Sequence, residues 1–301
     1  MKIINEILKK YNLNPYRYEK KGKATIVDTN SGRFVLKERS NNEKIFNYLK
    51  SRSFNYYPTD LSEGNDDYEI TEYIDELEMP NEQKMIDLIK LVSLLHSKTT
   101  YYKEIDYDDY KKIYEDIKNN IEYLNSYYND IITMIESHVY MSPSEYLFAS
   151  NISKVFGSLN FCEKEIDQWY NLVKNKTKQR SVILHNNLDL SHFFKNEKSY
   201  LVSWSKSKIG MPIFDLYILY KRHVLDFDFS EILKEYEKGY PLKEDERKLF
   251  FVLISLPNKL EFNNTEYNIT KEVSKEIEKI YRTEHFILPY YTKQNEQQPQ
   301  P

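Results

Sequence analysis

The stretch SVILHNNLDLSHFFKNEKSYLVSW, residues 181–204, carries the pattern that decides the fold. Its segments VILH and YLVSW have the length and apolar composition of short strands, and the polar segment FFKNEKS lies between them. The first of these strands ends at His185. Between it and the polar segment lie Asp189 and His192. This hairpin is therefore the candidate functional element of the chain.

The length and charge of the chain limit the classes of protein that fit it. Its 301 residues suffice for one two-lobed unit or two small domains. The 40% hydrophobic and 30% charged residues are typical of a soluble globular protein. Forty-three basic and 47 acidic residues give a net charge of −4, which does not favour nucleic acid or an anionic membrane as the main partner.

The cysteine content and the N-terminal residues exclude further classes of protein. Cys162 is the only cysteine, so there is no disulfide framework and no Cys-rich zinc site. Its apolar surroundings predict a buried, inert thiol. The N-terminal residues lack the apolar core of a signal peptide, and no apolar run approaches the ~18 residues of a membrane span. We expect a cytoplasmic protein without a membrane span.

The first 75 residues predict a small sheet with helices. A short helix is expected to start at Ile3 and to end before Pro15. Apolar and β-branched runs predict strands, with an Asn30-Ser31-Gly32 hairpin turn and a later polar turn EGNDD, at residues 16–20, 24–29, 33–38, 56–61 and 68–75. A helix is predicted over residues 41–53. The result is a five-stranded sheet with one helix after the third strand.

After Pro80 the apolar residues follow helical spacing almost throughout. Helices are predicted over residues 81–100, 110–135, 144–157, 163–177, 214–224, 229–239, 243–256 and 269–284. We expect a sheet lobe over residues 1–75 and a helical lobe over residues 76–290 that includes the hairpin. The polar, Pro-containing residues 291–301 are expected to form a disordered tail.

This order of elements resembles the protein-kinase-like fold, and more closely its aminoglycoside phosphotransferase and choline kinase branch. Lys37 in FVLKE occupies the position of the third-strand lysine, and TEYID, residues 71–75, looks like the segment that links the lobes. LVSLLHSKTT, residues 91–100, is similar to a helix of that branch that ends in Leu-His-x-x-Thr or Ser. The resemblance implies a two-lobed α+β fold with a small antiparallel-sheet N-lobe and a mainly helical C-lobe.

The resemblance also identifies the residues of the hairpin by position. The branch has a His-Gly-Asp-x-x-x-x-Asn loop followed by an Ile-Asp metal motif, and His185 matches its His. Asn187 stands where the catalytic Asp belongs, His192 replaces the metal-binding Asn, and Ser203 replaces the metal-binding Asp. In GMPIFDLYILY, Asp215 matches the aspartate that braces the catalytic loop, so its implied role is structural.

The chemistry of these replacements argues against ordinary phosphoryl transfer, which needs cations on the phosphates and carboxylates for the metal and for the acceptor's proton. The amide of Asn187 has no basic lone pair, so it cannot act as a general base. The neutral hydroxyl of Ser203 cannot replace an anionic ligand of Mg²⁺, and the imidazole of His192 suits zinc or copper better. Asp189, two residues beyond Asn187, is the substitute base that the loop offers.

For a nucleotide, the resemblance implies ATP, with Lys37 on its phosphates and Glu43 of the next helix as the carboxylate partner of Lys37. Glu38 lies nearby, so this assignment stays open. Only Lys20-Lys21-Gly22-Lys23 stands where a glycine-rich phosphate loop is expected. The sequence therefore leaves open whether a nucleotide binds.

A C-terminal segment carries a further resemblance. Residues 236–262, with a Pro-Leu, an acidic run, an aliphatic helix and a closing Pro, are similar to spore-coat-associated kinase-like proteins of the CotS and YsxE type. Some members of that group have also lost catalytic acids. The resemblance implies a protein partner in an assembly such as a spore coat, and the spore coat as a second location.

Three hypotheses follow from the sequence. The first is a pseudo-phosphotransferase, a binding or scaffold protein without Mg²⁺-dependent transfer and thus not an enzyme. The second is an active ATP-dependent phosphotransferase for a small hydroxylated acceptor, or another nucleotide transferase, which uses Asp189 and Asp215. The third is a protein that binds no nucleotide and acts only through its surface. The sequence favours the first.

Overall fold

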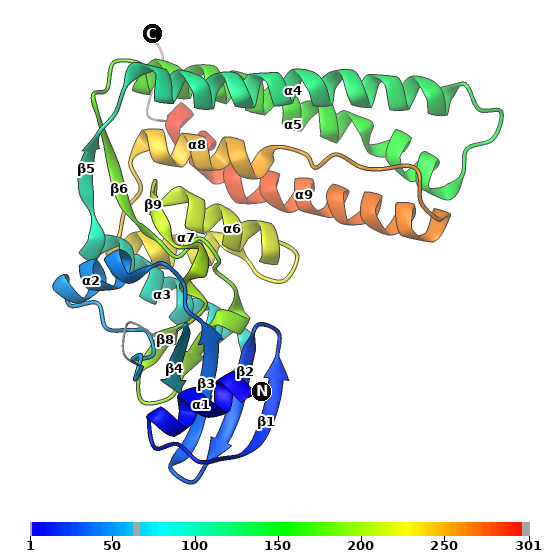
Figure 1. Ribbon diagram of the computed structural model, residues 1–301. Helices are drawn as coiled ribbons and strands as arrows, with labels where there is room; N and C mark the ends of the chain where they lie inside the picture. The colour runs from blue at the N-terminus through cyan, green and yellow to red at the C-terminus, as the bar shows by residue number, and fades with distance from the viewer. Residues whose placement is uncertain (1, 63–66, 297–301) are drawn as a thin grey trace. The chain divides into compact units, whose positions relative to one another are not determined.

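The computed structural model describes residues 2–62 and 67–296 (Figure 1). The strands are β1 (Pro15–Lys21), β2 (Ala24–Thr29), β3 (Gly32–Glu38), β4 (Tyr68–Glu72), β5 (Tyr101–Glu104), β6 (Lys178–Leu184), β7 (Phe193–Lys195), β8 (Ser199–Leu201) and β9 (Lys208–Gly210). The α-helices are α1 (Lys2–Lys10), α2 (Glu43–Ser51), α3 (Asn81–Thr99), α4 (Tyr107–Glu136), α5 (Pro143–Val173), α6 (Ile213–His223), α7 (Phe229–Gly239), α8 (Glu244–Ser255) and α9 (Glu266–Glu296). Two short 3-10 helices are η1 (Leu190–His192) and η2 (Trp204–Lys206).

The N-terminal strands form an antiparallel sheet in the order β1-β2-β3-β4. The predicted turn between β2 and β3 is confirmed, because Thr29 pairs with Gly32 and the Thr29 hydroxyl bonds both the Gly32 carbonyl and the Ser31 amide. Gly32 has φ +126°, which favours glycine at this position. Most of the predicted polar turn after Ser62, residues 63–66, lies outside the described residues.

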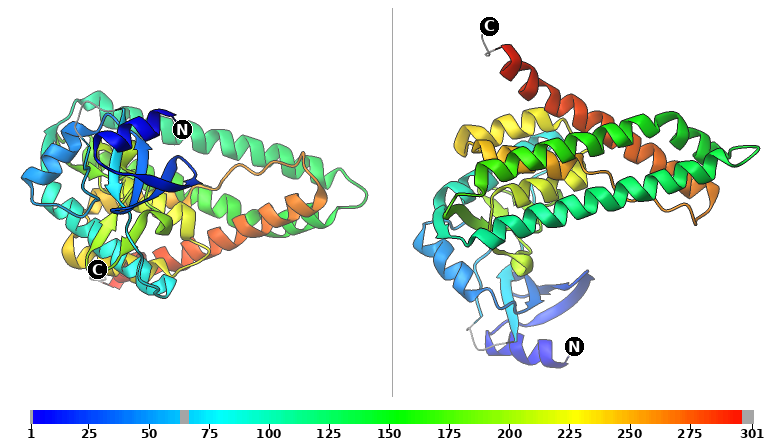
Figure 2. Two further views of the ribbon diagram at one scale, coloured as in Figure 1. Left: turned by 60° about the horizontal axis from the view of Figure 1, so that its bottom comes forward. Right: turned by 90° about the horizontal axis from the view of Figure 1, so that it is seen from above.

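The two faces of this sheet differ because side chains alternate along a strand. On one face, Val27, Phe34 and Leu36 are buried in a cluster with Leu8 of α1 and Ile70 of β4. Helix α1 lies against the sheet in the views of Figure 1 and Figure 2. The amphipathic N-terminal helix therefore covers one face and leaves the other face of the sheet for other contacts.

The predicted strand over residues 56–61 is wrong. Only Asp60 makes a bridge, to Thr71 of β4. Pro58 lacks the N–H that a strand uses for pairing. In addition, the Asp60 carboxylate accepts hydrogen bonds from the amides of Ser62 and Ile70, at 2.9 and 3.1 Å, so that a side chain replaces part of the strand pairing.

The long helices α4 and α5 lie side by side in antiparallel directions (Figure 1; Figure 2, right). The helix predicted over residues 110–135 is confirmed as α4, and its apolar side chains are half-buried at Ile113 and Ile131 and buried at Tyr110, Ile117, Ile121, Leu124, Tyr128 and Ile135. The prediction of two helices over residues 144–177 is wrong, because α5 continues through Gly157. Packing overrides the low helix propensity of this glycine: Leu159 and Cys162 beyond it are completely buried.

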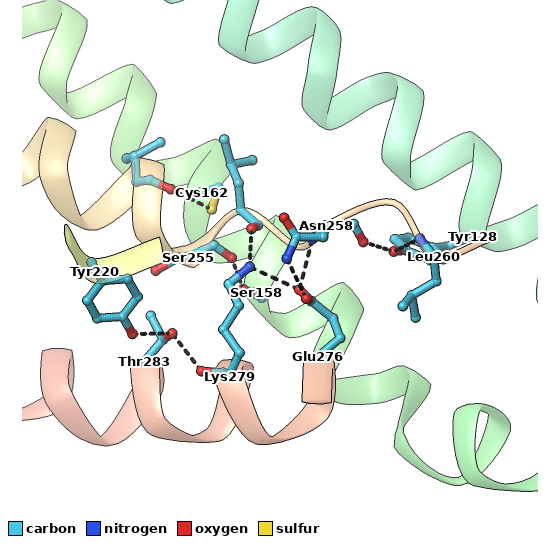
Figure 3. Close-up of polar contacts among 12 residues, drawn as sticks. Tyr128, Ser158, Cys162, Tyr220, Ser255, Asn258, Leu260, Glu276, Lys279 and Thr283 are labelled. Atoms are coloured by element: carbon cyan, nitrogen blue, oxygen red, sulfur yellow. Dashed lines mark hydrogen bonds and ion pairs between the residues drawn. The ribbon is translucent and has the colours of Figure 1, made fainter. Parts of the chain in front are cut away.

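Helices α5, α8 and α9 pack on one another, and polar bonds tie the connection between α8 and α9 to them (Figure 3). Asn258 donates its amide N–H and its side-chain Nδ2 to the two carboxylate oxygens of Glu276, at 2.8 and 2.6 Å. The Ser158 hydroxyl donates to the Ser255 carbonyl at 2.5 Å. Cys162 is buried nearby, as predicted, and burial raises the pKa of its thiol to about 12.

The described residues divide into two compact units. We call residues up to Thr99 together with His185–Lys208 the sheet unit, and Thr100–Leu184 together with the residues from Ile209 onward the helical unit. The hairpin thus groups with the N-terminal sheet, whereas the sequence places it in the helical lobe. Helix α3 also belongs to the sheet unit, and the small sheet β5-β6-β9 lies in the helical unit, apart from Lys208.

The fold class expected from the sequence is confirmed. A small antiparallel sheet at the N-terminus and a mainly helical C-terminal part make up the two-lobed, kinase-like α+β class. Helix α9 runs to Glu296 and so includes the first residues of the expected tail, while residues 297–301 lie outside the described ones. Among the described helices, none has an apolar stretch long enough to cross a membrane.

Candidate functional site

The loop after β6 and strand β8 are held together by two histidines in the sheet unit. His185 is fully buried, and its Nε2 lies 2.9 Å from the Val202 carbonyl oxygen. His192 Nδ1 lies 2.8 Å from the Asn187 carbonyl oxygen, and the Val202 amide donates to the His192 carbonyl at 3.0 Å. These contacts link the side chain of His185 and the backbone of His192 to Val202, the residue before Ser203, and link the His192 ring to the Asn187 backbone.

Two non-glycine residues of the hairpin have left-handed backbone conformations. Asn186 has φ +56°, and Ser203 has φ +68° and ψ +47°. Asn186 stands where the resembled branch has glycine, and asparagine is among the residues that tolerate this conformation best. Ser203 has no such advantage, so the hairpin holds it at an energetic cost of ~1 kcal/mol or more. Such strain is typical of functional positions.

Asp189 caps the short helix η1. Its Oδ1 accepts hydrogen bonds from the Ser191 amide at 2.8 Å and from the Ser191 hydroxyl at 2.7 Å. The carboxylate that the sequence offers as a substitute base thus also has a structural role.

Trp204 connects the hairpin to helix α2 within the sheet unit. Its indole ring lies 4.8 Å from the ring of His185 and 6.0 Å from that of Phe46, measured between centroids. The Trp204 carbonyl accepts a hydrogen bond from Asn42 Nδ2 at 2.6 Å. The ring of Tyr57 packs edge-on against the indole ring, with 6.3 Å between the ring centroids. The backbone next to Ser203 is therefore fixed by aromatic packing and by one side-chain hydrogen bond from the residue that precedes α2.

Lys37 lies on β3, directly opposite Glu69 of β4 in the antiparallel register. Burial lowers the pKa of Lys37 below its ordinary value, and the charge of Glu69 offsets part of that effect. Glu69 Oε1 also accepts from the Ser40 amide and hydroxyl, at 3.2 and 3.3 Å. The expected partner Glu43 is exposed at the first position of α2, so the carboxylate that acts on Lys37 comes from the neighbouring strand.

The same face of the sheet carries an apolar surface beside Lys37. Val35 lies two residues before Lys37 on β3, and it pairs in register with Ile26 of β2. All three side chains therefore lie on the face opposite to α1, and all three are half-buried. A flat aliphatic surface next to a partly buried cation has the properties that a planar, anionic ligand such as a nucleotide requires.

Asp215 belongs to the helical unit. It is completely buried in the first turn of α6. The role that the resemblance implies for Asp215, to brace the catalytic loop, stays a prediction.

Residues with the spacing of a metal site do not appear in the described part of the chain, where no group of three or more His, Cys, Asp or Glu side chains could hold a metal ion. Two surface cavities of about 340 and 290 Å³ lie in the helical unit against α9, and their walls contain no hairpin residue. The predicted site residues Lys37, Asn187, His192 and Ser203 lie on β3 and in the hairpin, which are therefore kept as the candidate site.

Sequence reasoning missed two residues of this site, Glu69 and Asn42. Glu69 could not be predicted as the partner of Lys37, because the pairing register of two strands that are separated by a helix cannot be derived from the sequence of either strand. Asn42 has a detectable signal, since Asn directly before a helical pattern is a helix-capping position, but its bond goes to Trp204 and not to its own helix.

Comparison with known proteins supports the fold. None of the protein-family models matches the sequence, and no curated protein does. Among solved structures, an aminoglycoside phosphotransferase from Alicyclobacillus acidocaldarius has a TM-score of 0.70 at 9% identity, over 96% of this chain and 95% of that one. The AMP-bound spectinomycin phosphotransferase APH(9)-Ia has a TM-score of 0.55 at 12% identity, over 94% and 97%.

A choline kinase, LicA from Streptococcus pneumoniae, matches with a TM-score of 0.49 at 15% identity, over 96% of this chain and 99% of that one. At identities of 9% and 12%, the likenesses to the two phosphotransferases show the fold alone. The chain has the kinase-like fold of the aminoglycoside phosphotransferases, as the resemblance implied.

Proposed function

We propose that this protein is a pseudo-phosphotransferase: a kinase-like protein that binds a nucleotide at the face of its N-terminal sheet that carries Lys37 and does not catalyse Mg²⁺-dependent phosphoryl transfer. The observation that carries the proposal is the chemistry of the hairpin. At the positions that the resemblance assigns to the proton acceptor and the metal ligands, the hairpin has Asn187, His192 and Ser203, and none of them is a carboxylate.

The contacts within the hairpin support this view of the metal site. His192 Nδ1 is engaged with the Asn187 carbonyl, so one imidazole nitrogen serves the loop itself. Ser203 is neutral, and Mg²⁺ prefers anionic oxygen ligands and water. The hairpin residues therefore do not fit a catalytic magnesium ion, and we assign no step to one.

The sheet face supports the nucleotide. Lys37 supplies a desolvated ammonium, and Ile26 and Val35 supply an aliphatic surface beside it. Phosphate oxygens would provide the counter-charge that burial makes favourable for Lys37. One of the similar solved structures is described as an AMP-bound complex. ATP is therefore the nucleotide that we propose, with Lys37 on its phosphates.

A transfer assay tests the absence of catalysis. Purified full-length protein is incubated with ATP and Mg²⁺ and with a panel of amino-alcohols and aminoglycosides, and ADP formation is measured beside Lys37→Ala. We expect no ADP above the level of Lys37→Ala with any acceptor. Mg²⁺-dependent ADP formation that Lys37→Ala abolishes would contradict the proposal.

The second candidate function is an active phosphotransferase with Asp189 as the base. The observation in its favour is that Asp189 lies in the same loop as Asn187 and has a half-buried, ordered carboxylate. It predicts an activity in the wild type that Asp189→Asn abolishes. Against it stands the structural role of the same carboxylate, which caps η1 by accepting hydrogen bonds from the Ser191 amide and hydroxyl.

The proposed role is that of a binding or scaffold protein. The resemblance of residues 236–262 to spore-coat-associated kinase-like proteins suggests a protein assembly such as a spore coat as its setting. In such a protein, a nucleotide would act by stabilising the binding-competent state of the sheet unit and not as a phosphate donor.

A further inference from the structure

The turn between β1 and β2 is a tight hairpin. Lys21 and Ala24 are paired across the two strands, so only Gly22 and Lys23 form the connection. Gly22 has φ +60°, the conformation that a two-residue turn with glycine in its first position requires. A longer glycine-rich loop surrounds phosphate with backbone amides, and a two-residue turn has too short a backbone to do so. Positive charge for a phosphate at this end of the sheet must therefore come from side chains.

The strand register places Lys21 in line with Lys37. Thr25 of β2 pairs with Leu36 of β3, so the adjacent residues Ala24 and Lys37 stand opposite each other. Ala24 in turn pairs with Lys21 of β1. Because directly paired residues point to the same side of a sheet, both lysines lie on the face opposite to α1. From β1 to β4, one row of this face consists of Lys21, Ala24, Lys37 and Glu69.

The dimensions of this row suit a ligand with several phosphates. Neighbouring strands are ~4.8 Å apart, so the backbones of β1 and β3 are separated by about 10 Å. Ala24, with a single methyl group, lies between the two lysines and leaves space above β2 for ligand atoms. A chain of phosphates spreads its charge over such a distance and can contact both ammonium groups, whereas a single phosphate group has its charge at one point.

The charge of this part of the chain also favours an anionic ligand. Residues 1–40, which include α1 and the first three strands, contain ten basic and four acidic residues, although the whole chain has a net charge of −4. A local excess of positive charge raises the concentration of anions near the surface. Lys21 is exposed, so its ammonium group is accessible to such an anion.

Three carboxylates share this face of the sheet with the two lysines: Glu19, Asp28 and Glu69. Asp28 forms an ion pair with Arg33, with 2.7 Å between Oδ1 and Nε. Glu69 accepts hydrogen bonds from the amide and the hydroxyl of Ser40. Glu19 is exposed one row away and is thus the carboxylate that competes with a ligand for the lysine ammonium groups.

We propose that Lys21 is a second phosphate-binding residue, and that Lys21 and Lys37 together hold the phosphates of a nucleoside triphosphate without a metal ion. This inference rests on the proposed function, because it concerns the same nucleotide. Two ammonium groups supply the positive charge that Mg²⁺ supplies in sites where carboxylates hold it. The lysine pair therefore makes a triphosphate a better ligand than a monophosphate.

Isothermal titration calorimetry of the full-length protein with ATP and with AMP, both in EDTA, tests this role. The variants are Lys21→Ala, Lys21→Arg, Glu19→Gln and Lys20→Ala. Lys20 is the matched control, since it is an exposed lysine of the same strand and pairs with Thr25 on the face that α1 covers. The Tm of each variant without ligand is compared with that of the wild type, so that a loss of folding is not mistaken for a loss of binding.

We expect Lys21→Ala to bind ATP about tenfold more weakly than the wild type, because a hydrogen bond between charged groups is lost. Its affinity for AMP should change by less than about threefold, since an exposed charge that is not in direct contact contributes little. Lys21→Arg should keep most of the ATP affinity, and Lys20→Ala should keep all of it. Glu19→Gln should bind ATP more tightly, because the competing carboxylate is removed.

The possible failures can be told apart. ATP binding by Lys21→Ala that equals that of the wild type would overturn the role of Lys21 and leave nucleotide binding intact. An equal loss in Lys20→Ala, or an equal loss for AMP and ATP, would also overturn it, because overall charge and not contact with the phosphate chain would explain the effect. A wild type that binds no ATP at millimolar concentration would overturn the proposed function and the lysine pair with it.

Discussion

Lys37 shows how far single residues can be predicted. The pattern FVLKE was sufficient to propose the third-strand lysine, and the structure places Lys37 on β3, half-buried. Its carboxylate neighbour was not predictable. The nearest candidates in the sequence are Glu38 and Glu43, whereas the strand register pairs Lys37 with Glu69, more than thirty residues away. Pairing between strands depends on the path of the chain, which no local pattern records.

The lowered pKa of Lys37 leads to a prediction about stability. Because burial disfavours the ammonium, the unfolded state holds this proton more tightly than the folded state does. Between the lowered pKa of Lys37 in the folded state and its pKa of 10.5 in the unfolded state, the unfolded state binds more protons. The contribution of Lys37 to the free energy of unfolding should therefore increase with pH over this range. Lys37→Met removes the buried charge and should raise the free energy of unfolding without ligand by about 0.5–2 kcal/mol at pH 7.

Urea denaturation at several pH values checks this prediction, with Lys44→Met as the control for an exposed lysine of α2. The advantage of Lys37→Met over the wild type should shrink as the pH approaches 10.5. A variant that is less stable than the wild type at pH 7, or an advantage that stays constant with pH, would show that burial does not penalise this ammonium. Glu69 keeps its hydrogen bonds to Ser40 in either case.

The secondary-structure elements were more predictable than their partners. Helices with a continuous apolar stripe, such as α4, appear where the sequence placed them, because burial and helical spacing agree. The predicted elements were wrong where tertiary contacts determine whether a helix or a strand forms. Helix α5 continues through Gly157, and residues 56–61 form a single bridge because the Asp60 side chain takes the place of strand pairing. The short strands β5 and β9 have too few residues for a recognisable alternation.

The connection between α8 and α9 allows a test at this scale. The Tyr128 hydroxyl of α4 donates to the Asn258 carbonyl and accepts from the Leu260 amide at 3.3 Å, and the ring is fully buried (Figure 3). Tyr128→Phe leaves both backbone groups without this partner, which should lower the free energy of unfolding by about 1–3 kcal/mol. Tyr140→Phe removes a hydroxyl from an exposed ring and should change stability by less than ~0.5 kcal/mol.

Chemical denaturation of both variants beside the wild type measures the difference. If Tyr128→Phe is as stable as Tyr140→Phe, the connection does not depend on the tyrosine hydroxyl, and the bonds from Asn258 to Glu276 suffice to hold it. The result thus separates the contribution of α4 from that of α9.

The kinase-like α+β class of the whole molecule followed from the order of strands, helices and hairpin, and similar solved structures support it. The two compact units each combine segments that are distant in the sequence. A hairpin that lies more than 100 residues after the sheet nevertheless groups with it, through contacts such as Asn42 to the Trp204 carbonyl and Leu201 to the Tyr56 carbonyl. Long-range contacts of this kind assemble the candidate site from separate parts of the chain.

The two proposals concern the same unit but different residues. The proposed function depends on Lys37 and the hairpin, whereas the second phosphate contact belongs to Lys21 on the edge strand β1. Lys37→Ala should therefore abolish nucleotide binding, and Lys21→Ala should only weaken it. The size of the loss thus separates a failure of the second proposal from a failure of the first.

Thermal denaturation with and without ATP, each in Mg²⁺ and in EDTA, tests the central claim most directly. A ligand at about 100 times its Kd stabilises the native state by ~2.7 kcal/mol, so 1 mM ATP with a Kd of about 10 μM gives a clear shift. We predict the same ATP-dependent increase in Tm with Mg²⁺ and with EDTA, and its loss in Lys37→Ala. An increase that appears only with Mg²⁺ would contradict the loss of the metal site, and no increase in either condition would contradict nucleotide binding.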